Sequence, residues 1–456
     1  MSRTKEEFVP IKKGEVKIYN CGPTVYNYIH VGNARPLVVF DTLRRYFEYL
    51  GYDVTYVSNF TDIDDKIINR ANEENVESVD IANKYIKAFM EDAKGLNLYE
   101  YETINPRPTE YMDEIIEFVD GLVKKGAAYE LDGDVYFDIN KAKDYGKLSK
   151  KNLEDLIAGA RVDINDKKKS PADFALWKAK KEGEPYWESP WGQGRPGWHI
   201  ECSVMADSIL GETIDIHAGG VDLQFPHHEN EIAQSETLHD KTFANYWMHN
   251  GFITVDEEKM SKSLGNFFTV REISEKYDLE VLRFFLISAH YRMPVNFSDA
   301  VMEQSRAGLE RIYNAKYKLE DLLKVAEDKE SIGFDNTTVK RVKEFEKAMD
   351  DDLNTADAVS VIFELVKDIN TNLDENSPKA DIMYAYNTLN NLTKVLGILN
   401  KKREELDDDE ILKLIDDREE ARKNKDYKKA DEIRDKLLDM GIKLEDTRDG
   451  VKYRRV

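Results

Sequence analysis

The sequence predicts an α/β protein that opens with a domain of the nucleotide-binding type, interrupted by an insertion, and continues into an all-α bundle and a small terminal module. Two observations predict this class. Residues 15–60 have the pattern of a strand, a helix and a strand, and almost everything beyond residue 298 is charged and helical in period. The length of 456 residues suggests about three modules of roughly 150 residues each.

The first element pair forms a crossover. Residues 16–20 alternate as a short strand, residues 34–50 carry apolar side chains at helical spacing, and Gly51 ends that helix. Residues 54–58 follow as a second buried strand, which completes a strand, helix, strand unit. The chain has no G-x-G-x-x-G motif, which argues against a dinucleotide site. Any phosphates are therefore expected to be held in another way.

The middle and the end of the chain have different residue patterns, which predict different kinds of structure. Residues 111–190 contain Gly-Asp turns, a Lys-rich segment and a run of aromatic side chains, which indicates an insertion in the α/β domain. From Gly197 onward the residue pattern again predicts strands and loops. Helical periods predict a bundle at 303–324, 338–351, 356–373 and 377–396. After a charged linker at 401–409, two helices and a turn at 446–453 predict a small tail module.

Composition limits the class of protein. Hydrophobic residues make up 41% of the chain and charged residues 34%, as in a folded soluble protein. No apolar run reaches the roughly 18 residues that span a bilayer, and residues 2–7 are polar, so the cytoplasm is the expected location. Two cysteines cannot form a disulfide framework, which leaves the thiols available for chemistry. The net charge of -23 excludes general coating of nucleic acid, so RNA binding would need local basic patches.

A first candidate motif lies between the first strand and its helix. His30, Gly32 and Asn33 stand where helix amides and the positive end of the dipole favour an anion such as the phosphates of ATP. The imidazole can donate to a phosphate oxygen, and Gly32 permits close approach because it has no Cβ. A histidine and a glycine near a turn are more often structural, so both interpretations stay open.

A second candidate motif is the Lys-Met-Ser-Lys-Ser string at residues 259–263, which is followed by Gly265. Lys259 and Lys262 can place cations over charge that develops on phosphates, and a loop that ends in glycine lets them move. An exposed polar loop is the alternative for any such string.

Four further residues are typical metal ligands. Cys21 follows the first strand, Cys202 lies in a Gly-Trp-His-Ile-Glu-Cys string, and His227 and Glu231 are four residues apart. Pro226 predicts a helix start, so His227 and Glu231 are expected to project from one helix face. Two thiolates, one imidazole and one carboxylate suit Zn²⁺. Buried cysteines that pack as small apolar residues are the alternative.

The two phosphate motifs, in this order and far apart, resemble the paired signatures of class I aminoacyl-tRNA synthetases. Within that class, residues 19–26, 59–66, 197–202 and 215–231 are similar to the cysteinyl-tRNA synthetases, and the resemblance spans essentially the whole chain. The resemblance implies a Rossmann-like catalytic domain at 1–110 and 195–250, a connective insertion at 111–194, a stem-contact region with the lysine loop at 251–300, a helical bundle at 301–400 and an anticodon-binding module at 405–456.

The resemblance also implies an activity. Such a monomeric enzyme uses ATP with Mg²⁺ to convert L-cysteine to its adenylate and then transfers cysteine to tRNA(Cys). His30 and Asn33 would stabilise the α-phosphate, Lys259 and Lys262 the pyrophosphate, and Gly32 would contact ATP. The first motif of the class I synthetases usually ends in a histidine where Asn33 stands, and asparagine is a known variant of that motif. The implied Zn²⁺ ligands are Cys21, Cys202, His227 and Glu231.

The implied amino-acid pocket consists of Thr61, Trp198, His199 and Asp222. An apolar pocket separates near-isosteres of cysteine by only about 1–3 kcal/mol, whereas a zinc–thiolate bond has no counterpart in serine or alanine. Zinc would therefore act as the selectivity filter, and a separate editing domain is not expected.

Two other functions fit parts of the sequence. A related ligase joins cysteine to an amino-sugar inositol and shares the ATP and zinc motifs, but it would not need residues 405–456. A non-catalytic tRNA-binding paralogue would be expected to lose the ATP motifs, yet His30 and Lys262 are present. The basic tail around Tyr453 favours base stacking and phosphate contact at an anticodon.

Overall fold

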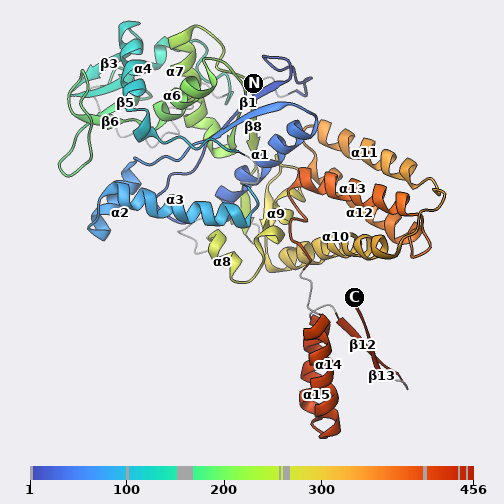
Figure 1. The fold of residues 1–456 in the computed structure, drawn as a ribbon. Helices are drawn as coiled ribbons and strands as arrows, with labels where there is room; N and C mark the ends of the chain where they lie inside the picture. The colour runs from blue at the N-terminus through green and yellow to red at the C-terminus, as the bar shows by residue number, and fades with distance from the viewer. Residues whose placement is uncertain are drawn as a thin grey trace.

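The computed structural model describes residues 4–98, 102–150, 168–255, 258–259, 268–403, 408–439, 442–447 and 450–455. A parallel sheet with the strand order β2-β1-β7-β8 lies at the centre of the α/β part (Figure 1). Its strands are β1 (Glu15–Asn20), β2 (Asp53–Ser58), β7 (Ile214–Gly220) and β8 (Ala244–Asn250). Helix α1 (Val31–Tyr49) connects β1 to β2, so the predicted crossover is confirmed.

Helix α1 begins at Val31, three residues before residue 34, where the helical spacing of apolar residues in the sequence begins. His30 caps it, because the His30 side chain accepts from the Asn33 backbone and the Asn33 side chain accepts from the His30 backbone. The helix ends at Tyr49, and Gly51 follows with a φ of 89°, a conformation that glycine adopts without strain.

An antiparallel sheet with the order β3-β4-β5-β6 follows α4 (Met112–Lys124) in the chain and precedes α6 (Trp198–Leu210), and the two helices contact each other. Its strands are β3 (Ala128–Leu131), β4 (Asp134–Phe137), β5 (Phe174–Ala179) and β6 (Gly194–Pro196). Trp177 is fully buried in the apolar cluster of this sheet, which extends onto α6 and onto α7 (Glu229–His239). Part of the aromatic run in the sequence therefore belongs to the core of this layer.

Shorter elements link the sheets to the helical half. Helices α2 (Asp65–Glu74) and α3 (Ser78–Gly95) follow β2. A small sheet contains β9 (Ile253–Val255), β10 (Glu258–Lys259) and β11 (Val295–Phe297). Helices α8 (Val270–Ser274) and α9 (Leu279–Ile287) lie between β10 and β11 in the sequence.

The predicted bundle consists of α10 (Asp299–Val325), α11 (Phe334–Asp350), α12 (Thr355–Asn372) and α13 (Lys379–Leu396). The observed ends differ from the apolar periods by a few residues because caps decide them. Ser298 caps α10 and Asn354 caps α12 through side-chain oxygens. Among the residues that the structure describes, no helix combines the length and apolar character needed to cross a membrane.

The last elements form a separate small unit, drawn below the bundle in Figure 1. It contains α14 (Asp408–Lys423), α15 (Tyr427–Asp439) and a hairpin of β12 (Ile442–Thr447) and β13 (Gly450–Arg455). Ile411, Ile415, Leu437 and Ile442 form its own apolar cluster. Most of the segment 446–453, which the sequence predicts as a turn, therefore belongs to paired strands, with residues 446–447 in β12 and 450–453 in β13.

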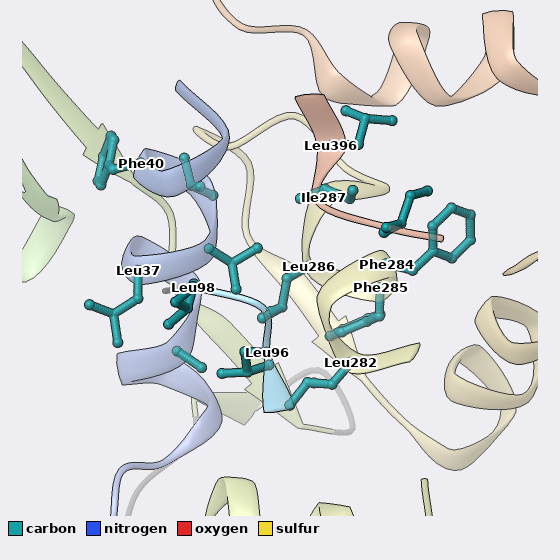
Figure 2. Packing of buried hydrophobic residues seen from close by; sticks show 14 of the residues in the cluster. Leu37, Phe40, Leu96, Leu98, Leu282, Phe284, Phe285, Leu286, Ile287 and Leu396 are labelled. Carbon is teal, nitrogen blue, oxygen red and sulfur yellow. The ribbon is translucent and has the colours of Figure 1, made fainter. Parts of the chain in front are cut away.

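An apolar interface joins the α/β half to the bundle (Figure 2). Figure 2 shows α1, α9, the end of α13 and the segment after α3 close together, with Leu96, Leu98, Leu282, Leu286, Ile287 and Leu396 among the apolar side chains at this junction, while Phe40 lies on the opposite side of α1.

A buried charge cluster lies at the same junction. The Asp41 carboxylate on α1 binds Arg44 at 2.8 Å, Arg45 at 2.7 Å and, on α9, Arg283 at 2.7 Å. Arg283 also donates to the carbonyl oxygens of Leu396 and Leu96. Burial opposes the charged form of Asp41, but three guanidinium groups outweigh it and lower the pKa of this carboxyl.

Asp41→Asn removes the carboxylate charge that three buried guanidinium groups share. We expect it to lower the free energy of unfolding by about 3–5 kcal/mol, measured by urea denaturation. The control Glu310→Gln breaks an exposed pair with Arg306 and should cost less than about 1 kcal/mol. Because the folded pKa of Asp41 is lowered, its contribution is present above the unfolded pKa and is lost as the pH falls through the folded pKa. Equal losses in the two variants would contradict this account.

Candidate metal centre and active site

The carboxyl edge of the parallel sheet gathers several predicted site residues. Cys21 follows β1, Thr61 follows β2, and Asp222 lies in a short turn directly after β7. Parallel strands end at one edge, where ligands of such sheets bind. Two backbone hydrogen bonds fix the edge, from the Cys21 amide to Ala218 at 3.1 Å and from the Thr61 amide to Pro23 at 3.2 Å.

The four residues predicted to hold a metal lie together and are buried. Ligand atoms of Cys21, Cys202, His227 and Glu231 all lie within 4.8 Å of one another. The two sulfur atoms are 3.9 Å apart, Cys21 Sγ lies 3.6 Å from Glu231 Oε1, and His227 Nε2 lies 3.1 Å from that same oxygen. The segments that supply them are separated by up to 210 residues.

These separations fit a zinc tetrahedron. Zinc–sulfur bonds of about 2.3 Å give a sulfur–sulfur edge of about 3.8 Å, and zinc–nitrogen and zinc–oxygen bonds of about 2.0–2.2 Å give an edge of about 3.4 Å. The observed edges lie within a few tenths of an ångström of these values. Two sulfurs, one imidazole and one carboxylate are a donor set typical of Zn²⁺.

The local structure around His227 differs from the prediction. Pro226 does not start the α-helix; it lies within a π-type turn over Gln224–His228, and α7 begins at Glu229. Phe225 in this turn is extended, which interrupts the helical path. The contact between His227 and Glu231 persists because both His228 and Glu229 have right-handed helical angles, so the four-residue spacing still brings the side chains together.

A second histidine contacts the carboxylate of the cluster. His217 Nε2 on β7 lies 2.8 Å from Glu231 Oε2, and both side chains are fully buried. An alternative donor set therefore contains Cys21, His217, His228 and Glu231. A histidine that holds a metal-binding carboxylate fixes its orientation. The sequence analysis assigned no role to His217; its place in the strand that leads into the Asp222 turn is the signal that could have found it.

Burial makes the charged forms of these groups unfavourable. It raises the pKa of the Cys21 thiol well above its ordinary value, and it lowers the pKa of His227 to about 3. His227 is therefore neutral, as a metal ligand must be, while the thiols need a nearby cation to ionise.

Two predicted pocket residues contact His227. The Trp198 ring stacks on the His227 ring at a centroid distance of 4.3 Å, and His199 Nδ1 lies 2.9 Å from His227 Nδ1. Trp198 is 39% exposed, unlike the buried cluster beneath it, so it lies at the surface above the cluster. Gln234 holds the His199 backbone by donating to its carbonyl oxygen at 2.9 Å.

Thr61 connects to the cluster through an asparagine that the sequence analysis did not single out. Asn59 Nδ2 donates to Thr61 Oγ1 at 3.3 Å, while Asn59 Oδ1 accepts from the Gly22 amide at 3.0 Å and lies 3.9 Å from Cys202 Sγ. Asp222 differs from the other predicted pocket residues. It is exposed, and no described contact joins it to the cluster.

The first phosphate motif lies at the N-terminus of α1. The His30 Nδ1 atom accepts from the Asn33 amide at 3.3 Å, so in a neutral ring the proton lies on Nε2. His30 is therefore a helix cap as well as a candidate phosphate donor. Gly32 and Asn33 belong to the first helical turn, where amide groups and the dipole favour an anion.

The second phosphate motif is described only in part. Lys259 pairs through its backbone with Thr254, and Lys262 lies outside the described residues. Residues 268 and 269, which follow the second motif, contact the first motif. Thr269 forms an antiparallel bridge with His30, and the Val31 amide donates to the Phe268 carbonyl oxygen at 3.2 Å. Residues 268–270, which follow the second motif in the chain, therefore adjoin the first motif in space.

Three family models match the chain. Residues 7–307 match the catalytic domain of "tRNA synthetases class I (C)", residues 344–400 match the "DALR domain", and residues 407–454 match the "Cysteinyl-tRNA ligase anticodon binding domain".

Solved structures share the fold at low sequence identity. A Mycobacterium tuberculosis methionyl-tRNA synthetase in complex with methionyl-adenylate has a TM-score of 0.58 and 14% identity, covering 84% of this chain and 89% of its own. A leucyl enzyme from Agrobacterium radiobacter K84, in a ternary complex titled LeuRS-tRNA-LeuAMS, has a TM-score of 0.62 and 12% identity over 86% of this chain and 85% of its own.

Curated relatives are much more similar in sequence. A Cysteine--tRNA ligase of Clostridioides difficile is 60% identical over 460 residues, covering 100% of this chain and 99% of the relative. A Cysteine--tRNA ligase of Finegoldia magna is 61% identical over 456 residues, covering 100% of this chain and 98% of the relative. With the match of the catalytic-domain model over residues 7–307, this similarity shows that the chain belongs to the cysteine-specific family of class I tRNA synthetases.

Proposed function

We propose that the chain activates L-cysteine with ATP, recognises the substrate thiolate through zinc, and transfers cysteine to the 3′ end of tRNA(Cys). Membership of the family makes the chain a ligase that charges tRNA with cysteine. The observation that carries the finer proposal is the convergence of four buried donors at the edge lengths of a zinc tetrahedron.

Cys21, Cys202, His227 and Glu231 would hold the zinc ion, and His217 would orient Glu231. When bound, zinc supplies a Lewis acid that favours a thiolate over a thiol or a hydroxyl. Trp198 and His199 contact His227 and would hold its ring in place. The Trp198 ring is partly exposed above the cluster, which suits a pocket for a small amino acid. Selection of cysteine against serine then follows from sulfur chemistry and needs no editing step.

ATP would bind at the N-terminus of α1. His30 caps the helix through Nδ1, so in the neutral ring Nε2 carries the proton and is a donor suited to the α-phosphate. Gly32 and Asn33 lie in the first turn of the helix. Lys259 and Lys262 would neutralise the pyrophosphate together with Mg²⁺. The bridge between Thr269 and His30 supports this assignment because it anchors the segment that follows the lysine motif.

The domain division follows the same scheme. Residues 1–110 and 195–250 form the catalytic domain, 111–194 the connective insertion, 251–300 the stem-contact region, 301–400 the bundle and 405–456 the anticodon module. We propose that the enzyme acts as a monomer in the cytoplasm.

Cys202→Ser removes one of the two sulfur donors. We expect loss of the bound zinc, measured by mass spectrometry of the purified protein, and a fall of about 10³-fold or more in kcat/KM for cysteine in ATP–pyrophosphate exchange. The control His239→Ala removes a histidine that instead contacts Asp207, and it should keep both properties. Full selectivity for cysteine over serine in a metal-free protein would overturn the zinc mechanism.

His30→Asn separates the two roles of His30. Asparagine is a good helix cap, so the thermal stability should be unchanged, but the imidazole donor is lost. We expect kcat for cysteine-dependent exchange to fall by about 10²–10³-fold with little change in zinc content. Asn27→Ser, in the same loop, is the matched control. A normal kcat in His30→Asn would remove His30 from the proposed ATP site.

Truncation after residue 404 tests the proposed RNA partner. The described part of the terminal module has its own apolar cluster, so its removal should leave the rest folded. We expect aminoacylation of tRNA to be crippled while cysteine-dependent exchange persists. A ligase that acts on a small amine would keep full product formation after the same truncation.

A further inference from the structure

Arg271 is a charged side chain near the candidate phosphate site that has no role in the scheme above. It lies in α8, two residues after Thr269. Its guanidinium donates to the Ala88 carbonyl oxygen at 3.2 Å and to the Glu91 carboxylate at 2.5 Å, and its Nε atom lies 3.2 Å from the Asp92 carboxylate. One side chain therefore joins α8 to three residues of α3.

The same guanidinium reaches the loop that carries His30. It lies over the ring of Tyr28, 4.8 Å from the ring centroid, and a cation over an aromatic face is attracted to it. The other neighbour of the Tyr28 ring is Tyr85 of α3, which it meets edge-on at a centroid distance of 5.3 Å. Tyr28 precedes His30 by two residues. Arg271 thus holds together α8, α3 and the loop before α1.

Backbone contacts connect this anchor to His30 itself. Residues 268–270 pair with residues 29–31 through the bridge between Thr269 and His30 and through two backbone hydrogen bonds of 2.9 and 3.2 Å. Arg271 is the next residue along the chain. Because the pairing is this short, the side-chain contacts that follow it help to fix where the segment lies. The backbone position of His30 depends on the same contacts.

The contacts of Arg271 require an arginine. Its planar guanidinium has five N–H donors in a fixed fork, so it can serve two carboxylates and a carbonyl oxygen while one face covers a ring. A lysine ammonium is a compact point charge and cannot occupy all of these positions. Asp92 is 5% exposed, and a buried carboxylate needs a cation beside it, so the Asp92 charge keeps the guanidinium in place.

We infer that Arg271 is a positioning residue for His30, because it holds residues 268–270 against the loop that presents the imidazole to ATP. The inference rests on the proposed role of His30 at the α-phosphate. A donor that stabilises charge developing in the transition state acts at a defined distance, and a displacement of about 1 Å can cost on the order of 10²-fold in rate. Loss of the anchor therefore lowers kcat and leaves the binding of ATP nearly unchanged.

The first test replaces the guanidinium. For Arg271→Gln we expect kcat of cysteine-dependent ATP–pyrophosphate exchange to fall about 10- to 100-fold, with KM for ATP and for cysteine within about threefold of wild type and the zinc content unchanged. Arg271→Lys keeps a cation beside Asp92 but loses the fork, so its kcat should lie between the two. Rates are measured below the melting temperature of each variant, and Arg271→Lys carries the test if Arg271→Gln is unstable.

A double-mutant cycle with His30→Asn separates positioning from a general structural effect. If Arg271 acts through the imidazole, Arg271→Gln should cost less than about threefold in kcat once His30 is replaced. Arg70→Gln is the matched control and should leave kcat unchanged. The Arg70 side chain is 37% exposed, close to the 35% of Arg271, and it pairs with Glu74 and contacts the Tyr85 hydroxyl.

Each other outcome contradicts the inference. An equal loss in both backgrounds would give Arg271 a structural role only, and a normal kcat in Arg271→Gln would show that His30 needs no such anchor. A raised KM for ATP with a normal kcat would indicate direct contact with ATP. A normal kcat in His30→Asn alone would instead overturn the proposed ATP site, so the two failures are distinguishable.

Discussion

The whole site depends on one constraint, which is that parallel strands end at the same edge of a sheet. Cys21 after β1, Asn59 and Thr61 after β2, and His217 within β7 meet there although they are distant in sequence. Cys202 comes from α6, His227 from the turn before α7 and Glu231 from α7, and apolar packing holds these helices against the sheet. Cys21 and Cys202 share their apolar cluster with Tyr19, Met205, Ile232 and Phe243. The same core that stabilises the sheet therefore sets the distances between the donors.

This arrangement buries polar groups, and some of them find neither an opposite charge nor a hydrogen-bond partner among the described side chains. Burial disfavours the thiolate of Cys21 and the charged form of His227, and it leaves Oε2 of Glu201 without a partner. Stability and binding are linked here, because ligands that bind the folded state compensate groups that folding alone leaves unpaired.

Helix α1 connects the chemistry to the helical half of the molecule. Its N-terminal turn carries His30, and farther along it Asp41 binds Arg283 of α9, which in turn holds the end of α13 through the Leu396 carbonyl oxygen. The apolar contacts in Figure 2 cover the same junction. The helix that presents a candidate phosphate site is thus also a rigid support for the bundle, and its position relative to the bundle is fixed by both charge and packing.

The sequence by itself determined the elements that can be recognised from the spacing of apolar and polar residues within one short segment. The first crossover, the four helices of the bundle and the four metal-binding candidates could all be predicted from spacing and residue type, because helix and strand periods and ligand chemistry are properties of short segments. Only the tertiary structure decided the rest. The start of α1 depended on the reciprocal cap of His30 and Asn33, and the start of α7 on the turn around Pro226. The contacts of Asn59 with Cys202 and of His217 with Glu231 join segments that no local pattern relates, so proximity and burial had to be known before Asn59 and His217 could be recognised.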